Sequence, residues 1–174
     1  NKIKNTFLLT LILWVMLLSC NNKEKTLFTS LSSSDTHITF ENSLQQKKLF
    51  SILYYLYYYN GGGVATGDIN NDGLPDIYFT ANSKGNNKLY LNKGGFKFED
   101  ISATAGFAEK QKWSTGVVMV DINADGWLDI YVCNAGYQKG VGQENELYIN
   151  NKNGTFTEKA KDYAQRHKVP RFYS

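Results

Sequence analysis

A nine-residue segment rich in oxygen-bearing side chains occurs twice in this chain. The first copy runs from Asp68 to Asp76 and the second from Asp121 to Asp129. Both copies place Asp, Asn, Asp and Asp at positions 1, 3, 5 and 9, with glycine at position 6. Side chains of this kind crowd together only if a hard cation lies between them, and Ca²⁺ accepts about 6–8 oxygen ligands in flexible geometry. We therefore predict two calcium sites, one in each copy.

Each predicted site combines four side chains with one backbone oxygen. Gly73 and Gly126, at position 6, permit the sharp turn that such wrapping requires, because glycine adopts a positive φ without a Cβ clash. The carbonyl of position 7 supplies a further oxygen. The predicted ligands are Asp68, Asn70, Asp72, Leu74 (carbonyl) and Asp76 in the first loop, and Asp121, Asn123, Asp125, Trp127 (carbonyl) and Asp129 in the second.

The two segments begin like EF-hand loops but continue differently. An EF-hand requires Glu at position 12 and a helix on either side, whereas position 12 here is Phe79 in one copy and Val132 in the other. The runs after the loops, Ile77–Thr80 and Ile130–Cys133, are rich in β-branched and aromatic residues, which is typical of strands. The sequence therefore predicts calcium loops that lie between strands.

The duplication continues beyond the loops. Lys88–Asn92 is echoed by Glu146–Asn150, and each run is followed by a Gly-containing turn and a second short run. Turn residues between two apolar runs indicate a hairpin. A repeat of about four short strands is typical of a propeller blade. We predict an all-β fold in which residues 37–165 form two tandem β-propeller blades, at about 49–107 and 108–165.

A tyrosine-rich run, Ile52–Tyr59, lies at the start of the first predicted blade. Its composition gives it a high strand propensity, so we predict a strand here. The tyrosines also suit a stacking surface for sugars or nucleic acid. We prefer the interpretation that they pack against a sheet.

Residues 1–19 have the features of a secretory signal peptide. Lys2 and Lys4 precede the apolar run Phe7–Leu18. This run is short for a membrane span of about 20 residues, but it fits the apolar region of a secretory signal.

The apolar run ends in Leu17-Leu18-Ser19-Cys20, which resembles the lipobox of bacterial lipoproteins. The resemblance implies cleavage before Cys20 and a diacylglyceryl group on its thiol, and hence a lipid anchor in the membrane. An ordinary cleaved signal is the alternative. The polar residues 20–36 are predicted to be a flexible tether, and residues 166–174 a truncated tail.

The repeated residues resemble the VCBS/FG-GAP repeats of integrin α-chain propellers and of many secreted bacterial proteins. The resemblance rests on Gly63–Asp68 and Asp76–Phe79 in the first copy, and on Gly116–Asp121 and Asp129–Val132 in the second. It implies a β-propeller with Ca²⁺ bound in the blade loops and a surface for adhesion or partner binding. Together with the lipobox, it is similar to the N-terminal part of ASPIC/UnbV-type lipoproteins.

Two blades do not close a ring, and their open faces and strand edges would be exposed. Repeat folds generally need three or more units. We therefore expect this chain to be a piece of a longer protein, and association with other copies is the alternative.

The chain lacks the residue patterns of common enzymes. Its two histidines, His37 and His167, lie outside the repeated core, and no G-x-S-x-G, P-loop, G-x-G-x-x-G or H-E-x-x-H pattern occurs. The spacing of the carboxylates suits metal coordination better than acid–base catalysis. The formal net charge of +3, without clustered Lys and Arg, argues against nucleic-acid binding.

We therefore predict a non-catalytic, calcium-stabilised repeat protein that is lipid-anchored outside the cytoplasm in the bacterial cell envelope. Its role would be adhesion or binding of a protein or glycan ligand. Two alternatives stay open. One is a dockerin-like calcium module, in which helices follow the loops, and the other is a carbohydrate-binding module built on exposed tyrosines.

Overall fold

The computed structural model describes residues 26–44, 52–53, 55–82, 87–107, 112–135 and 144–166. The chain divides into two compact units, Asn1–Leu31 and Ser32–Ser174. The described part of the first unit, residues 26–31, is exposed. The predicted signal peptide and Cys20 lie outside the described residues.

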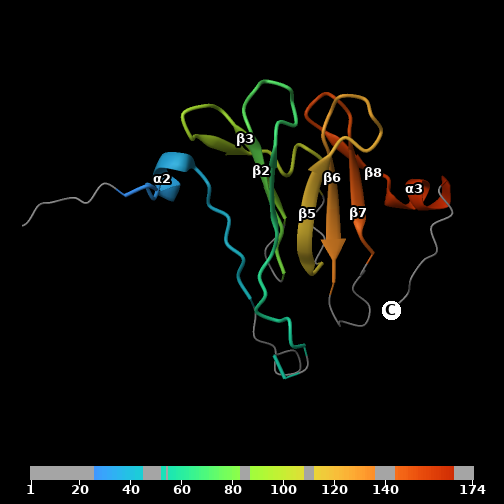
Figure 1. Ribbon diagram of the computed structural model, residues 1–174, viewed down its shortest axis with the longest axis horizontal. Helices are drawn as coiled ribbons and strands as arrows, with labels where there is room; N and C mark the ends of the chain where they lie inside the picture. Colours follow the sequence, from blue (N-terminus) through green and yellow to red (C-terminus); the bar gives the residue numbers. More distant parts are fainter. Residues whose placement is uncertain are drawn as a thin grey trace, which may run out of the picture. The chain divides into compact units, whose positions relative to one another are not determined.

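The second unit contains two four-stranded antiparallel sheets, each with its strands in sequence order (Figure 1). The first sheet consists of β1 (Val64–Gly67), β2 (Asp76–Phe79), β3 (Lys88–Asn92) and β4 (Phe98–Asp100). The second consists of β5 (Ser114–Val120), β6 (Asp129–Asn134), β7 (Glu146–Asn150) and β8 (Phe156–Glu158). Two antiparallel sheets with sequential strands confirm the predicted all-β fold of two tandem blades.

Two short helices flank the sheets, α2 (Ser33–Thr36) and α3 (Ala160–Arg166). Neither of these helices, which are the ones found in the described residues, is long and apolar enough to cross a membrane. The second compact unit begins at Ser32 and includes α2. This helix therefore lies in the segment, residues 20–36, that was predicted to be a flexible tether.

The two acidic segments close the first hairpin of each sheet. Gly67 pairs with Asp76 at the end of the β1–β2 ladder, and Val120 pairs with Asp129 at the end of the β5–β6 ladder. The loops therefore run between paired strands, as the sequence predicts. Strands, and not helices, follow both loops, which argues against the dockerin-like alternative.

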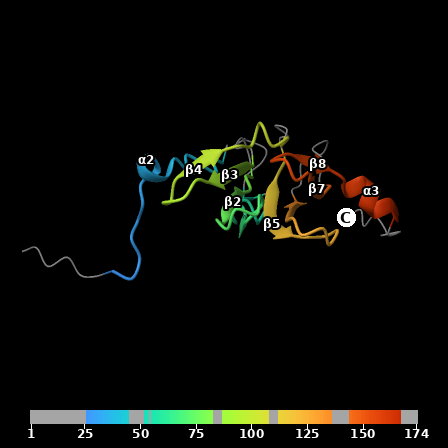
Figure 2. The same ribbon diagram turned by 90° about the horizontal axis from the view of Figure 1, so that it is seen from above.

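The main core lies between the two sheets, which stand side by side with β1 against β5 (Figures 1 and 2). The first sheet contributes Tyr78 and Leu89, which are paired across β2 and β3. The second contributes Ile130 and Val132 from β6. Residues 101–107, which follow β4, add Ala105 and Phe107 to the same core. Burial of these apolar side chains is the main force that holds the sheets together.

The tyrosine-rich run Ile52–Tyr59 forms turns and not a strand in its described residues, so the strand predicted here is wrong. Tyr58 is buried, with its ring centroid 5.3 Å from that of Trp113, whereas Tyr57 and Tyr59 are exposed. Strand propensity depends on the surface against which a segment packs. Packing of Tyr58 on Trp113 decides the conformation here.

Glycines allow the inner strands of the two sheets to approach closely. A Cβ atom on Gly63 would lie 2.9 Å from the Cα of Gly116, and one on Gly67 would lie 2.6 Å from the Cδ1 of Leu128. Both distances are shorter than packed carbon atoms tolerate. The second sheet thus leaves no room for a side chain at Gly63 or Gly67, the two glycines before the first loop.

We expect Gly63→Ala to destabilise the protein by about 1–3 kcal/mol, because the added methyl group overpacks the contact between the sheets. Gly116→Ala is the matched control, because its Cβ would lie at an ordinary 3.6 Å from the Cβ of Cys133. Urea unfolding monitored by circular dichroism measures both free energies. Equal stabilities of the two variants would contradict the close approach.

Candidate functional site

The two acidic loops have the same backbone conformation. The residue at position 4 is left-handed in both, with φ of 59° at Asn71 and 58° at Ala124. The glycine at position 6 is also left-handed, with φ of 86° at Gly73 and 84° at Gly126. Two left-handed residues so close together bend the chain tightly. The prediction that the position-6 glycine adopts a positive φ at a sharp turn is therefore confirmed, and the residue at position 4 also adopts a positive φ.

The position-1 carboxylates accept hydrogen bonds from the backbone inside each loop. Asp68 accepts from the N–H groups of Asp72 at 3.1 Å and Gly73 at 2.7 Å. Asp121 accepts from Asp125 at 3.0 Å and Gly126 at 2.8 Å. Because backbone N–H groups converge on a carboxylate in each case, these bonds fix the side chain inside its loop.

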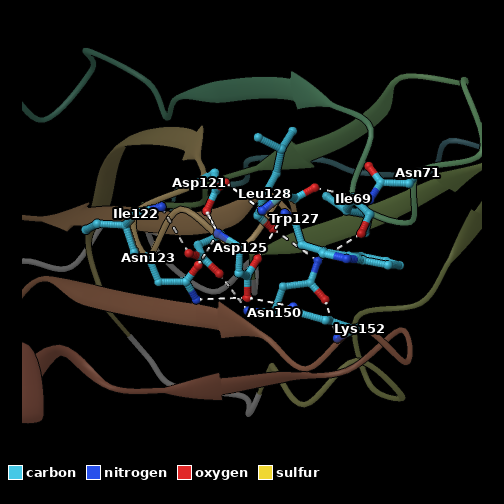
Figure 3. Close-up of polar contacts among 12 residues, drawn as sticks. Ile69, Asn71, Asp121, Ile122, Asn123, Asp125, Trp127, Leu128, Asn150 and Lys152 are labelled. Atoms are coloured by element: carbon cyan, nitrogen blue, oxygen red, sulfur yellow. Dashed lines mark hydrogen bonds and ion pairs between the residues drawn. The ribbon is translucent and has the colours of Figure 1, made fainter.

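Positions 3, 5 and 7 form a second set of contacts. In the first loop Asp72 accepts from the N–H of Leu74 at 2.8 Å, and Asn70 donates its amide to Asp72 at 2.9 Å. In the second loop the corresponding distances are 3.0 Å for Trp127 to Asp125 and 3.1 Å for Asn123 to Asp125. The side chains of positions 3 and 5 thus lie in contact in both loops, whereas position 7 contributes its N–H to these contacts and not the carbonyl predicted as a ligand. Figure 3 shows the contacts of the second loop.

The position-9 carboxylates are fully buried. Asp76 accepts from the N–H of Ile69 at 3.0 Å and of Asn92 at 2.8 Å. Asp129 accepts from Ile122 at 3.2 Å and Asn150 at 2.8 Å. Each carboxylate therefore joins its own loop to the third strand of its sheet.

Burial raises the pKa of Asp76 and of Asp129 above the usual value, although two backbone hydrogen bonds oppose the shift. Negative charge at positions 1 and 5 raises both pKa values further. In each loop the carboxylates at positions 1 and 5 thus lie close enough to the position-9 carboxylate to repel its charge. A divalent cation among them would relieve that repulsion.

Oxygen donors in each loop suit a hard cation in number and in kind. As they stand, however, no three Asp, Glu, His or Cys side chains in the described part of the chain form a group that could hold a metal ion. Binding of a cation in either loop would therefore require the carboxylates to close further around it.

The second loop contains a counter-charge within the protein. The Lys152 ammonium lies 3.2 Å from the Asp125 carboxylate. Partial desolvation pushes the pKa of Asp125 upward, but hydrogen bonds from Lys152, the Trp127 N–H and Asn123 outweigh it, so this pKa lies below its usual value. The corresponding residue of the first repeat is Gly94, which has no side-chain charge.

Two asparagines join the loops to each other (Figure 3). Asn71 in the first loop donates its amide to the Gly126 carbonyl in the second at 3.2 Å. Asn150, at the end of β7, donates its amide to the carbonyls of Ile69 at 2.8 Å and Leu128 at 3.1 Å. Sequence analysis did not assign these roles. The matching positions of Asn92 and Asn150 in the two repeats are the signal that could have found the second.

We expect Asn150→Ala to destabilise the protein by about 1–3 kcal/mol, because it leaves buried carbonyls of both loops without a donor. Asn92→Ala is the matched control from the first repeat, where the half-buried amide donates to the exposed Pro75 carbonyl. Its effect should be smaller. Thermal unfolding of both variants measures the difference, and an equal or larger loss for Asn92→Ala would contradict the bridging role.

We expect Lys152→Met to lower the free energy of unfolding at pH 7 in calcium-free, low-salt buffer. A folded-state pKa below the unfolded value of about 3.9 stabilises the fold above that pH. This contribution is lost as the pH falls through the folded-state pKa of Asp125. The difference from wild type should therefore shrink as the pH falls below the unfolded value of about 3.9 and disappear once the Asp125 carboxyl is protonated in the folded state. Denaturant unfolding over a pH series measures it.

The control for this prediction is Lys159→Met, which breaks an exposed ion pair with Asp162 outside the loops. Such a pair contributes at most about 1 kcal/mol. A loss of stability in Lys152→Met that persists unchanged at low pH would show that packing of the lysine side chain, and not its charge, is responsible.

Part of this chain is similar to known proteins. Residues 68–132 match the FG-GAP-like repeat. Cartilage acidic protein 1 of Xenopus tropicalis is 40% identical over 70 residues, which cover 40% of this chain and 11% of that protein. The Mus musculus protein of the same name is 39% identical over 70 residues, with the same coverage.

The chain thus matches only about a tenth of the length of these relatives. The matched repeat begins at the first acidic loop and ends in β6, beyond the second loop. It therefore contains both loops, β2 to β5 and part of β6, whereas β1 (Val64–Gly67) precedes it. The resemblance predicted from the sequence is confirmed over this region: the chain carries an FG-GAP-like repeat at residues 68–132.

Proposed function

We propose that this chain is a non-catalytic, calcium-stabilised repeat module that presents a surface for adhesion or partner binding. The observation that carries the proposal is the identical geometry of the two loops. In each, negative charge at positions 1 and 5 repels the charge of the buried position-9 carboxylate, and a backbone N–H holds the position-1 carboxylate within one tight turn. Calcium would offset this repulsion and lock the first hairpin of each sheet.

The proposed ligands are the side chains of positions 1, 3, 5 and 9 and the carbonyl of position 7. Position 9 has the largest structural consequence, because Asp76 and Asp129 also hold the third strand of each sheet through Asn92 and Asn150. An ion bound in the loop would therefore stabilise three strands and not only the turn. The ion's role in this proposal is structural.

FG-GAP repeats occur in extracellular and surface proteins, which supports a location outside the cytoplasm. The proposed anchor is a lipid on Cys20. This part of the proposal rests on the lipobox-like residues Leu17–Cys20. Metabolic labelling with a fatty-acid analogue tests it, because Cys20→Ala should abolish labelling if the thiol is the acceptor.

A carbohydrate ligand is the second candidate. Tyr57 and Tyr59 are exposed, and flat aromatic side chains of this kind provide stacking surfaces for sugar rings. Binding to a glycan array that Tyr57→Ala and Tyr59→Ala together remove would favour this ligand over a protein.

We expect the protein to bind two calcium ions, and chelation to lower its melting temperature. An ion present at 100 times its dissociation constant stabilises a fold by about 2.7 kcal/mol. Asp72→Ala and Asp125→Ala should each remove one ion, since each deletes the central carboxylate of one loop. Isothermal titration calorimetry measures the stoichiometry. Glu99→Ala, which changes an exposed carboxylate outside the loops, is the control and should leave both ions bound.

Absence of calcium uptake by a folded protein, verified by circular dichroism, would overturn the calcium proposal. Loss of both ions in either single variant would instead contradict two separate sites.

A further inference from the structure

The second acidic loop has an internal cation whose counterpart is missing from the first loop. The Lys152 ammonium lies 3.2 Å from the Asp125 carboxylate. The third strands of the two repeats are offset by 58 positions (150 − 92), so Gly94 stands at the corresponding place in the first repeat. In the described part of the chain, no Lys or Arg pairs with a carboxylate of the first loop. The lysine therefore distinguishes two loops that otherwise share their geometry.

The turn after the third strand positions this lysine. The side-chain oxygen of Asn150 accepts a hydrogen bond from the Lys152 N–H at 2.8 Å, and the amide of Asn150 donates to two backbone carbonyls. In the first repeat, Asn92 accepts the equivalent bond from the Gly94 N–H at 2.9 Å. Because the two turns share this bond, the difference between them lies in the side chain that each presents to its loop.

Lys152 also adopts a backbone conformation that favours glycine. Its φ is 64°, and the φ of Gly94 is 82°. A left-handed conformation costs free energy at a residue with a Cβ atom, whereas glycine adopts it freely. The lysine therefore destabilises its turn relative to glycine. The ion pair with Asp125 is an interaction that glycine at this position could not make.

The ion pair involves a carboxylate that the proposed calcium site requires. The Oδ2 atom of Asp125 accepts from the Asn123 amide at 3.1 Å and lies 3.2 Å from the ammonium (Figure 3). Asp72, at the same position of the first loop, accepts the equivalent amide bond without a lysine. A cation that takes Asp125 as a ligand must displace the ammonium or lie beside a second positive charge. Either event costs binding free energy.

We propose that Lys152 is a tethered competitor of calcium in the second loop, so that the first loop fills at lower calcium concentrations than the second. This inference rests on the proposed calcium binding and concerns the order in which the loops fill. The lysine side chain is 46% exposed, which leaves it room to turn into solvent when the ion binds. The second hairpin is then held by the lysine at low calcium and by the ion at higher calcium.

Variants with one intact loop measure each affinity separately. Asp125→Ala keeps only the first loop, and Asp72→Ala keeps only the second. Isothermal titration with calcium chloride in low-salt buffer should give a smaller dissociation constant for Asp125→Ala than for Asp72→Ala. Adding Lys152→Met to Asp72→Ala should tighten binding by the second loop about three- to tenfold, because the competing charge is removed.

Two controls separate the position of the charge from other effects of the substitution. Lys152→Arg keeps a positive charge in the turn and should leave the affinity of the second loop close to that with lysine. Lys159→Met removes the same charge from an exposed ion pair with Asp162 outside the loops. It should change the dissociation constant of neither loop.

Gly94→Lys tests the converse by placing a lysine beside the first loop. A Cβ atom on Gly94 would lie at an ordinary 3.9 Å from the Cδ1 of Leu74, so the turn has room for a side chain. In the Asp125→Ala background, this substitution should weaken binding by the first loop about three- to tenfold. Gly94→Met introduces the same backbone strain without a charge, and it should leave this affinity nearly unchanged.

An affinity of the second loop that Lys152→Met does not change would overturn this inference and leave the calcium proposal intact. Tighter binding by the second loop than by the first would do the same. A folded wild-type protein that takes up no calcium would overturn both. If Asp72→Ala loses its strand signal in circular dichroism, a two-site titration of Lys152→Met in the otherwise unchanged chain is judged by the same outcomes.

Discussion

The buried carboxylates of Asp76 and Asp129 are the groups on which loop and sheet both depend. Each accepts one N–H from its own loop and one from the third strand of its sheet. Burying a charged group costs free energy, and charge-assisted hydrogen bonds offset part of that cost. The offset is incomplete, because the pKa of both carboxyl groups is still raised by burial. A cation in the loop would supply the remaining compensation, which gives the proposed calcium ion a physical reason to be there.

The two loops have the same geometry but different electrostatic surroundings. Lys152 lies beside Asp125 in the second loop, whereas the first repeat has Gly94 at the corresponding position. Asn71 and Asn150 join the loops through backbone carbonyls. A change of charge or shape in one loop therefore acts on hydrogen bonds that position the other. The first loop, which has Gly94 in place of Lys152, would therefore gain more from the proposed cation.

Much of the fold follows from the duplicated segment, because an aspartate that begins a strand fixes both the loop and the ladder after it. Two features of the structure could not be predicted from this segment. The run Ile52–Tyr59 has the composition of a strand, but packing of Tyr58 on Trp113 decides its conformation. The bond from Asn150 to Ile69 crosses between repeats, so the matching positions of Asn92 and Asn150 mark the residue but do not give its partner. The hydrogen bonds from backbone N–H groups to the loop carboxylates were not predicted, because the repeated pattern gives the residue types but not the distances among them.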